Sequence, residues 1–236
     1  MMFVSAGSII ALLSVMIGLD KLSVYEDDIF YQLTRVDLFN IIFALDDVET
    51  YPYISKDDIS LFFLPVTFYF MSMSIGCSTF LLKKRNYYHF IYSRAGSKQS
   101  AFRWMKGDGI KRAAVFIISY HVTLYIVSHM TFLKGSEMPE QNLILYLVLH
   151  AINNICVIIF LQAGVFLVYC MKGVGEAVLV GAMLIIGMFI IDMMSDQFNI
   201  LLFNRNNYFI DGIIISGVLY MIVNKISRAK AIQLPY

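Results

Sequence analysis

"LILYLVLHAINNICVIIFLQAGVFLVY", residues 143–169, contains no Asp, Glu, Lys or Arg. A helix needs about 20 apolar residues to cross a bilayer, with a range of roughly 17–25, so this run is long enough to span one. The rest of the chain has the same character, because 59% of its 236 residues are hydrophobic and only 15% are charged. Soluble domains carry charge on about a quarter of their residues. The sequence therefore predicts a protein that crosses a membrane several times.

Five other apolar runs are long enough, or nearly long enough, to be spans. None shows the sustained alternation of a membrane β-strand, so helices are expected. The six predicted spans cover residues 2–19, 59–82, 113–133, 143–169, 177–194 and 208–223. We therefore predict an all-α fold, in which residues 1–236 form a single transmembrane domain of six helices.

The charged residues predict how these spans are oriented. Residues 83–112 hold nine of the 18 cations and one acid, Asp108, whereas residues 20–58 hold ten acids and three cations. Cytoplasmic loops are enriched in Lys and Arg, which places 83–112 and the cationic tail inside and the loop 20–58 outside. Both termini are then cytoplasmic.

The predicted outer loop also contains a half-apolar stretch, residues 29–45, with Arg35 and Asp37 inside it. We expect an amphipathic helix that lies at the membrane interface. The acids of the loop either attract a cationic peptide or simply follow the topology, and the sequence leaves both interpretations open.

The cationic loop contains "YSRAGSKQSAFRWMKGD", residues 92–108. Ser97 is a suitable N-cap and Gly107 a suitable residue after the helix end, so a short amphipathic helix is predicted over 97–106. Its apolar residues share one stripe, and its cations lie largely off that stripe. Such a helix either lies on anionic headgroups, at about 1 kcal/mol per cation, or docks in a groove of a soluble partner.

Six spans, a large outer loop after the first and a short helix between the second and third resemble the permease subunits of ABC exporters of the second structural type. The segment 92–108 is similar to the corresponding stretch of small permeases from bacterial peptide and bacteriocin export or self-immunity operons. In that family the short helix couples the spans to a separate ATPase, and a re-entrant outer hairpin precedes the last span, which residues 196–209 would match here. The resemblance implies the bacterial cytoplasmic membrane as location, with an ABC ATPase, a second permease copy or paralogue, and membrane lipid as partners. The implied ATPase contacts are Lys98, Ala101, Phe102, Arg103, Trp104 and Met105.

The chain contains no G-x-x-x-x-G-K-[ST] motif, the loop that binds ATP phosphates in many ATPases. We therefore expect no catalytic residue and no cofactor in this chain, with ATP and Mg²⁺ bound by the partner subunit. No H-E-x-x-H motif accompanies its histidines, so no metal site is expected. Nucleic acid is not an expected partner.

Four polar residues interrupt the long run quoted above. His150, Asn153 and Asn154 share one helix face, and Gln162 falls within about 80° of it at 3.6 residues per turn. These residues line a translocation path, or they form hydrogen bonds between helices worth about 0.6 kcal/mol each. Both interpretations stay open.

Two acids, Asp192 and Asp211, fall near the outer ends of the fifth and sixth predicted spans. We expect both carboxylates to be in contact with water. A role in proton transfer would require a deeper carboxylate with a partner.

Two functions compete at this point. The first is a permease subunit that exports a peptide or another amphipathic substrate and is driven by an ATPase docked on 97–106. The second is a stand-alone immunity protein that binds a toxin in the membrane and does not transport.

Overall fold

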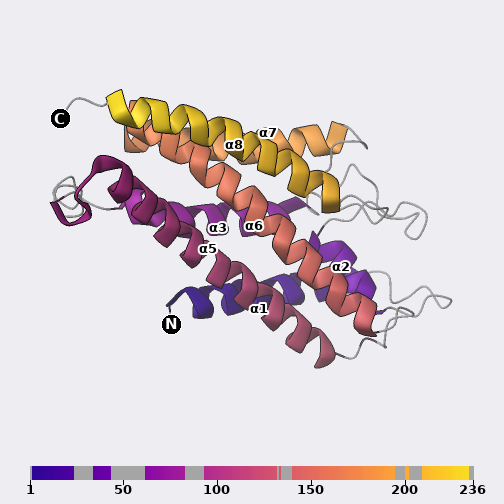
Figure 1. Ribbon diagram of the computed structural model, residues 1–236. Coiled ribbons are helices and arrows are strands. Elements are labelled where there is room, and N and C mark those ends of the chain that lie inside the picture. Colours follow the sequence, from indigo (N-terminus) through magenta and orange to yellow (C-terminus); the bar gives the residue numbers. More distant parts are fainter. Residues whose placement is uncertain are drawn as a thin grey trace.

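A computed structural model describes residues 2–23, 34–43, 62–82, 93–131, 133, 140–194, 200–201 and 209–233. The regular secondary structure in these ranges is helical, which confirms the predicted all-α class. The main helices are α1 (Met2–Ser23), α2 (Arg35–Phe43), α3 (Phe63–Leu81), α5 (Lys98–His129), α6 (Glu140–Met171), α7 (Val174–Met194) and α8 (Phe209–Gln233). The long helices alternate in direction, so α1, α5 and α7 begin at the end of the bundle where α3, α6 and α8 finish (Figure 1).

Five of the described helices are long and apolar enough to cross a membrane. The apolar segments are Met2–Ser23, Phe63–Leu81, Arg103–His129, Asn142–Met171 and Val174–Asp192. The sixth predicted span falls in α8, whose apolar part, Gly212–Ile226, is shorter. The chain is thus compatible with a multi-pass membrane protein.

The start of α5 is set by two residues that precede it. Gly96 has a φ of +69°, a left-handed conformation that suits glycine. Ser97 follows in extended backbone, and its hydroxyl accepts a hydrogen bond from the Ser100 N–H at 3.2 Å. Ser97 is therefore the N-cap, as predicted.

The predicted end of this helix at Gly107 is wrong. Helix α5 continues without a break from Lys98 to His129, so the cationic segment and the third span are one helix of 32 residues. Gly107 is not among the described glycines with positive φ, and Gly109 lies within the helix where it meets its neighbours. The propensity of a single glycine to end a helix is small compared with the packing of the residues that follow it.

Helix α2 also differs from the prediction of an interfacial helix over 29–45. Only 34–43 of that stretch is described, and every residue from Asp37 to Phe43 is buried. The Asp37 carboxylate accepts hydrogen bonds from the Thr34 N–H (2.6 Å) and hydroxyl (2.8 Å), so the helix start is capped from within. Because α2 packs against α1, α3 and α5, it is part of the core of the bundle.

Helix α1 packs along α5, far away in sequence (Figure 1). Thr123 donates a hydrogen bond to the Ser8 hydroxyl at 2.9 Å, and Tyr120 donates one to Ser14 at 3.2 Å. Gly7 permits this approach, because a Cβ there would overlap the Phe116 carbonyl. The outward side of α1 carries exposed apolar residues such as Leu12 and Met16, as expected for a face that contacts lipid.

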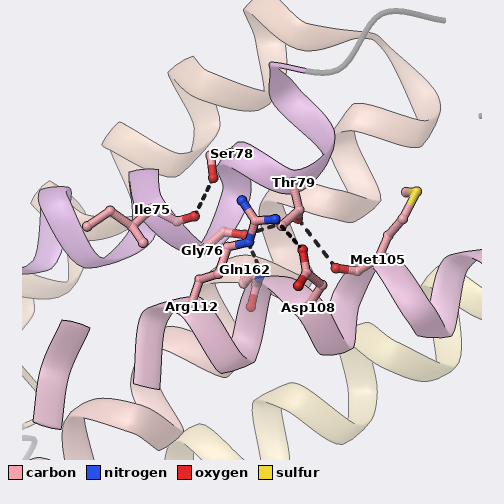
Figure 2. A network of polar contacts seen from close by, with 8 residues as sticks. All are labelled: Ile75, Gly76, Ser78, Thr79, Met105, Asp108, Arg112 and Gln162. Atoms are coloured by element: carbon pink, nitrogen blue, oxygen red, sulfur yellow. Dashed lines mark hydrogen bonds and ion pairs between the residues drawn. The ribbon is translucent and has the colours of Figure 1, made fainter. Parts of the chain in front are cut away.

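Three helices meet at a point that we call the inner joint, formed by Gly76 of α3, Gly109 of α5 and Gln162 of α6. Figure 2 shows the Gln162 amide donating to the Gly76 carbonyl, at 2.7 Å. A Cβ on Gly109 would overlap that same carbonyl and the Gln162 amide nitrogen. Thr79 adds a hydroxyl contact to the Met105 carbonyl at 3.4 Å. The joint therefore connects the cationic segment of α5 directly to two spans.

We predict that Gly109→Ala destabilises the protein by about 1–3 kcal/mol, the usual penalty for overpacking a core. The new methyl group has only backbone and a hydrogen-bonded amide to displace. The readout is thermal unfolding in detergent. Gly107→Ala, two residues away, is the matched control, because a Cβ there meets no atom within 4 Å. Equal melting temperatures for the two variants would contradict this account of the joint.

Candidate functional site

Most of the polar side chains predicted for the fourth span belong to one buried group, which we call the outer cluster. It brings together residues from four helices and the turn before α8, and each of the side chains is buried. Its members are His121 of α5, His150, Asn153 and Asn154 of α6, Tyr69 of α3, Asp192 of α7 and the backbone of Ile200 and Leu201.

The two histidines of the outer cluster are in direct contact. Nε2 of His121 lies 2.9 Å from Nδ1 of His150. Nδ1 of His121 lies 2.8 Å from the carbonyl oxygen of Ile117, one turn earlier on α5. Both ring nitrogens of His121 are therefore engaged, and its ring is fixed between α5 and α6.

Asn154 links this histidine pair to α3. Its amide nitrogen lies 3.3 Å from Nδ1 of His150. Its amide oxygen accepts a hydrogen bond from the Tyr69 hydroxyl, which is also 3.3 Å from the carbonyl oxygen of Leu201. A continuous series of polar contacts thus runs from α5 through α6 and α3 to the turn at 200–201.

Asp192 and Asn153 hold this turn against the bundle. The two Asp192 oxygens accept the N–H groups of Ile200 (3.0 Å) and Leu201 (2.6 Å), and the Asn153 amide donates to the Ile200 carbonyl at 3.3 Å. Asp192 is only 5% exposed, so the expectation that it meets water at a helix end is wrong. The side chain of Asp211, the other acid considered, lies outside the described side chains.

Aromatic rings pack around the histidine pair. The ring centroid of Phe43, from α2, is 4.0 Å from that of His150, and the ring of Phe68, from α3, is 6.0 Å from that of His121. The burial of α2 thus completes the wall of the site. Removing water from the pair makes each of its hydrogen bonds more important, because a buried polar group without a partner is costly.

Gln162 does not join the other three residues proposed for a translocation path. It lies two turns beyond Asn154 on α6 and makes its hydrogen bond at the inner joint (Figure 2). The predicted set therefore divides into two places, with His150, Asn153 and Asn154 in the outer cluster and Gln162 near the cationic start of α5. Nothing in the described contacts joins the two.

The six predicted ATPase contacts also divide. Ala101 and Met105 are buried in the protein itself, so their side chains are not available to a partner in this structure. Arg103 and Trp104 point outward, and Trp104 is 52% exposed. The side chains of Lys98 and Phe102 lie outside the described side chains. Among the predicted ATPase contacts whose side chains are described, Arg103 and Trp104 are thus the exposed ones.

Lys106, on the same segment, is held inside the bundle. Its ammonium donates to the Asn224 side chain of α8 at 3.2 Å and lies 4.8 Å from the ring centroid of Phe166. The residue thus fastens α5 to α6 and α8. Its ammonium group is therefore engaged by contacts within the chain.

An apolar groove of about 310 Å³ opens between α5 and α6. Its walls are mostly exposed branched side chains, and the His121 ring forms part of the lining. The lining residues are Ile118, His121, Val122, Tyr125, Ile144, Leu147, Val148, Ala151 and Ile152.

Sequence reasoning found half of the outer cluster. The spacing of His150, Asn153 and Asn154 on one face was a sufficient signal, but His121, Tyr69 and Asp192 lie on other helices. The sequence pattern along one helix does not show which face of a neighbouring helix packs against it. Among the described residues, no three His, Cys, Asp or Glu side chains gather as a metal site would require.

No family model, curated protein or solved structure matches this chain.

We predict that Asp192→Asn destabilises the protein by about 1–3 kcal/mol, because an amide offers one acceptor where the turn requires two. Thermal unfolding in detergent measures the change. Glu176→Gln is the control on the same helix, since Glu176 is exposed near its start. A melting temperature for Asp192→Asn as high as that of the control would show that the turn does not depend on the carboxylate.

Proposed function

We propose that this chain is the membrane-spanning permease subunit of a bacterial ABC transporter, driven by a separate ATPase that docks at the start of α5. In this proposal the chain has six spans, with both termini in the cytoplasm. A second permease copy or paralogue completes the transporter, and the cargo is a peptide or another amphipathic molecule.

The orientation is supported by where the described charges lie. Arg103, Lys111 and Arg112 lie in the first half of α5, Lys172 directly after the end of α6 and Lys225 in the second half of α8. The alternating directions of the helices bring these ends together (Figure 1). A cationic end of this kind belongs in the cytoplasm.

The observation that carries the proposal is the exposed Trp104 beside Arg103. At 1.5 Å per residue a helix of 32 residues is about 48 Å long, whereas the hydrocarbon core is about 30 Å thick. If α5 crosses the bilayer up to its outer end, its first dozen or so residues project on the inner side. An exposed tryptophan next to an arginine on such a projection is the composition typical of an interface hot spot.

The continuity of α5 supports a coupling role for this projection. A partner that pushes on Arg103 and Trp104 acts on the same rigid helix that meets α3 and α6 at the inner joint. The apolar groove between α5 and α6 is a surface on which the apolar part of an amphipathic cargo could lie, within reach of the helix that the ATPase would move.

The topology can be tested by labelling single cysteines. In a variant lacking Cys77, Cys156 and Cys170, we expect Ser100→Cys to react with a membrane-impermeant reagent only from the cytoplasmic side. Ser23→Cys, at the exposed end of α1, should react only from outside. Labelling of both positions from the same side contradicts the orientation.

The docking surface can be tested by pull-down with the ABC ATPases of the same cell. We expect Trp104→Ala to weaken binding by about 2 kcal/mol or more, roughly a thirtyfold loss of affinity, because an aromatic anchor is removed. Lys111→Gln, an exposed cation on the same helix, should change binding little.

Equal binding by the two variants contradicts the docking surface. If no ATPase binds the wild-type chain and a toxin peptide does, the chain acts instead as an immunity protein.

A further inference from the structure

The Tyr69 hydroxyl lies between two acceptors, the amide oxygen of Asn154 and the carbonyl oxygen of Leu201. A tyrosine has one hydroxyl proton, so it can donate to only one of them at a time. The orientation of the Asn154 amide decides which of the two acceptors receives the hydrogen bond of the Tyr69 hydroxyl. The oxygen and the NH₂ group of an amide have nearly the same shape, so the site accommodates both orientations.

The orientation of Asn154 depends in turn on the histidine pair. A carbonyl only accepts hydrogen bonds, so the contact with Ile117 requires a proton on Nδ1 of His121. When the pair is neutral, Nε2 of His121 is bare and must accept a hydrogen bond from Nδ1–H of His150, 2.9 Å away. The Asn154 side chain then faces the Nδ1–H donor of His150. Its amide oxygen, which accepts hydrogen bonds, is therefore the atom that turns toward His150.

In this neutral arrangement the donors of Asn154 and Tyr69 both point toward residues 200–201. The Asn154 amide donates to the Tyr69 oxygen, and the Tyr69 hydroxyl donates to the Leu201 carbonyl. The turn at 200–201 is thus bound to α3 as well as to Asp192 and Asn153.

Adding one proton to the histidine pair reverses the direction of these hydrogen bonds. The incoming proton binds Nε2 of His150, the Nδ1–H bond of His150 breaks, and an Nε2–H bond forms on His121, which carries the positive charge. Nδ1 of His150 is now an acceptor that faces the Asn154 NH₂ group, at 3.3 Å. The Asn154 oxygen then turns toward Tyr69 and accepts the hydrogen bond of its hydroxyl, so the Leu201 carbonyl loses that hydrogen bond.

We propose that His121 and His150 form a proton-binding site, and that binding one proton moves the Tyr69 hydrogen bond from Leu201 to Asn154 and loosens the contact of residues 200–201 with the bundle. The ligand is a proton taken from water. The inference does not depend on the proposed transport function, because it uses only contacts inside the outer cluster.

The surroundings of the pair contain few other groups that could take this proton. The titratable side chains around it among the described residues are Tyr120, which contacts the His121 ring, Tyr125, which lines the same groove as His121, and Tyr146, which contacts Phe43. Tyr69 reaches Asn154, and Asp192 reaches Leu201. Tyr120 donates to Ser14 of α1, and Asp192 already accepts two N–H groups. On α2, Phe43 faces the pair and Asp37 is bound to Thr34 at the other end of that helix, next to Arg35. From α8, Gly212 packs on Asn153.

Hydrogen exchange of the purified full-length chain in lipid nanodiscs tests the proposal. The pH is lowered from about 8 to about 3.5, past the ordinary range of histidine titration, because burial disfavours a charged imidazolium. Rates are corrected for the intrinsic effect of pH. We expect the amides of Ile200 and Leu201 to exchange about three- to tenfold faster at the lower pH, the effect of losing about one hydrogen bond. Nitrogen NMR of labelled histidine should show the extra proton over the same range.

Variants separate the steps. His150→Gln and His121→Gln, read independently so that one suffices if the other does not fold, should remove the pH effect at 200–201. Tyr69→Phe should give the faster rate at both pH values. His129→Gln is the matched control, since His129 lies on α5, is exposed and makes the same contact to the carbonyl four residues earlier (2.8 Å to Tyr125).

The proposal is overturned if the wild-type turn exchanges equally at both pH values, or if the pH effect survives in a folded His121→Gln or His150→Gln variant. It is also overturned if His129→Gln alone abolishes the effect. A pH effect that persists in Tyr69→Phe excludes the route through Tyr69.

Discussion

Polar groups inside a membrane bundle must find their partners within the bundle, because hydrocarbon offers none. This constraint accounts for the arrangement of α6. Its polar residues would be unfavourable toward lipid, so the helix turns them toward α3, α5 and the turn at 200–201. Each meets a polar group of another segment: a histidine, a tyrosine or a backbone carbonyl. The same constraint draws α2 into the core, because its Asp37 is satisfied by Thr34 and its apolar side chains fill the space around His150.

The apolar runs were sufficient to predict the long helices and the all-α class. Ser97 was also predictable, since an N-cap depends on residues close in sequence. The end of that helix was not, because α5 is prolonged through Gly107 and Gly109 by contacts with α3 and α6 that local propensity does not contain. For the same reason His150 was found and its partner His121 was not: the spacing on α6 gives the polar face of one helix, and only tertiary packing brings α5 to it. Asp192 shows a further limit, since hydropathy placed it at a span end but could not show that a returning segment would cover it.

The two polar places in the bundle have different characters. The inner joint is small and tightly packed: Gly109 leaves no room for a Cβ, and a Cβ on Gly76 would be in close contact with Ala113 and Gln162. The outer cluster is larger and contains groups that can donate or accept in more than one way, including two imidazoles, an amide and a hydroxyl. A rigid contact near the proposed ATPase surface and an adaptable one at the opposite end of the same helices suit a protein in which movement starts at one side and is expressed at the other.

The pairing of α1 with α5 also affects how the protein is made. Ser8 and Thr123, which are hydrogen-bonded, are 115 residues apart in the chain. At about 5–20 residues per second, a ribosome needs roughly 6–23 s to synthesise the intervening chain. During that interval α1 lacks α5, the helix along which it mainly packs, and Ser8 and Ser14 lack the hydroxyl partners that they have in the folded bundle. Helix α1 can therefore pack against α5 only after about half of these 236 residues have been translated. Until then, α1 is a segment to which a membrane chaperone would bind.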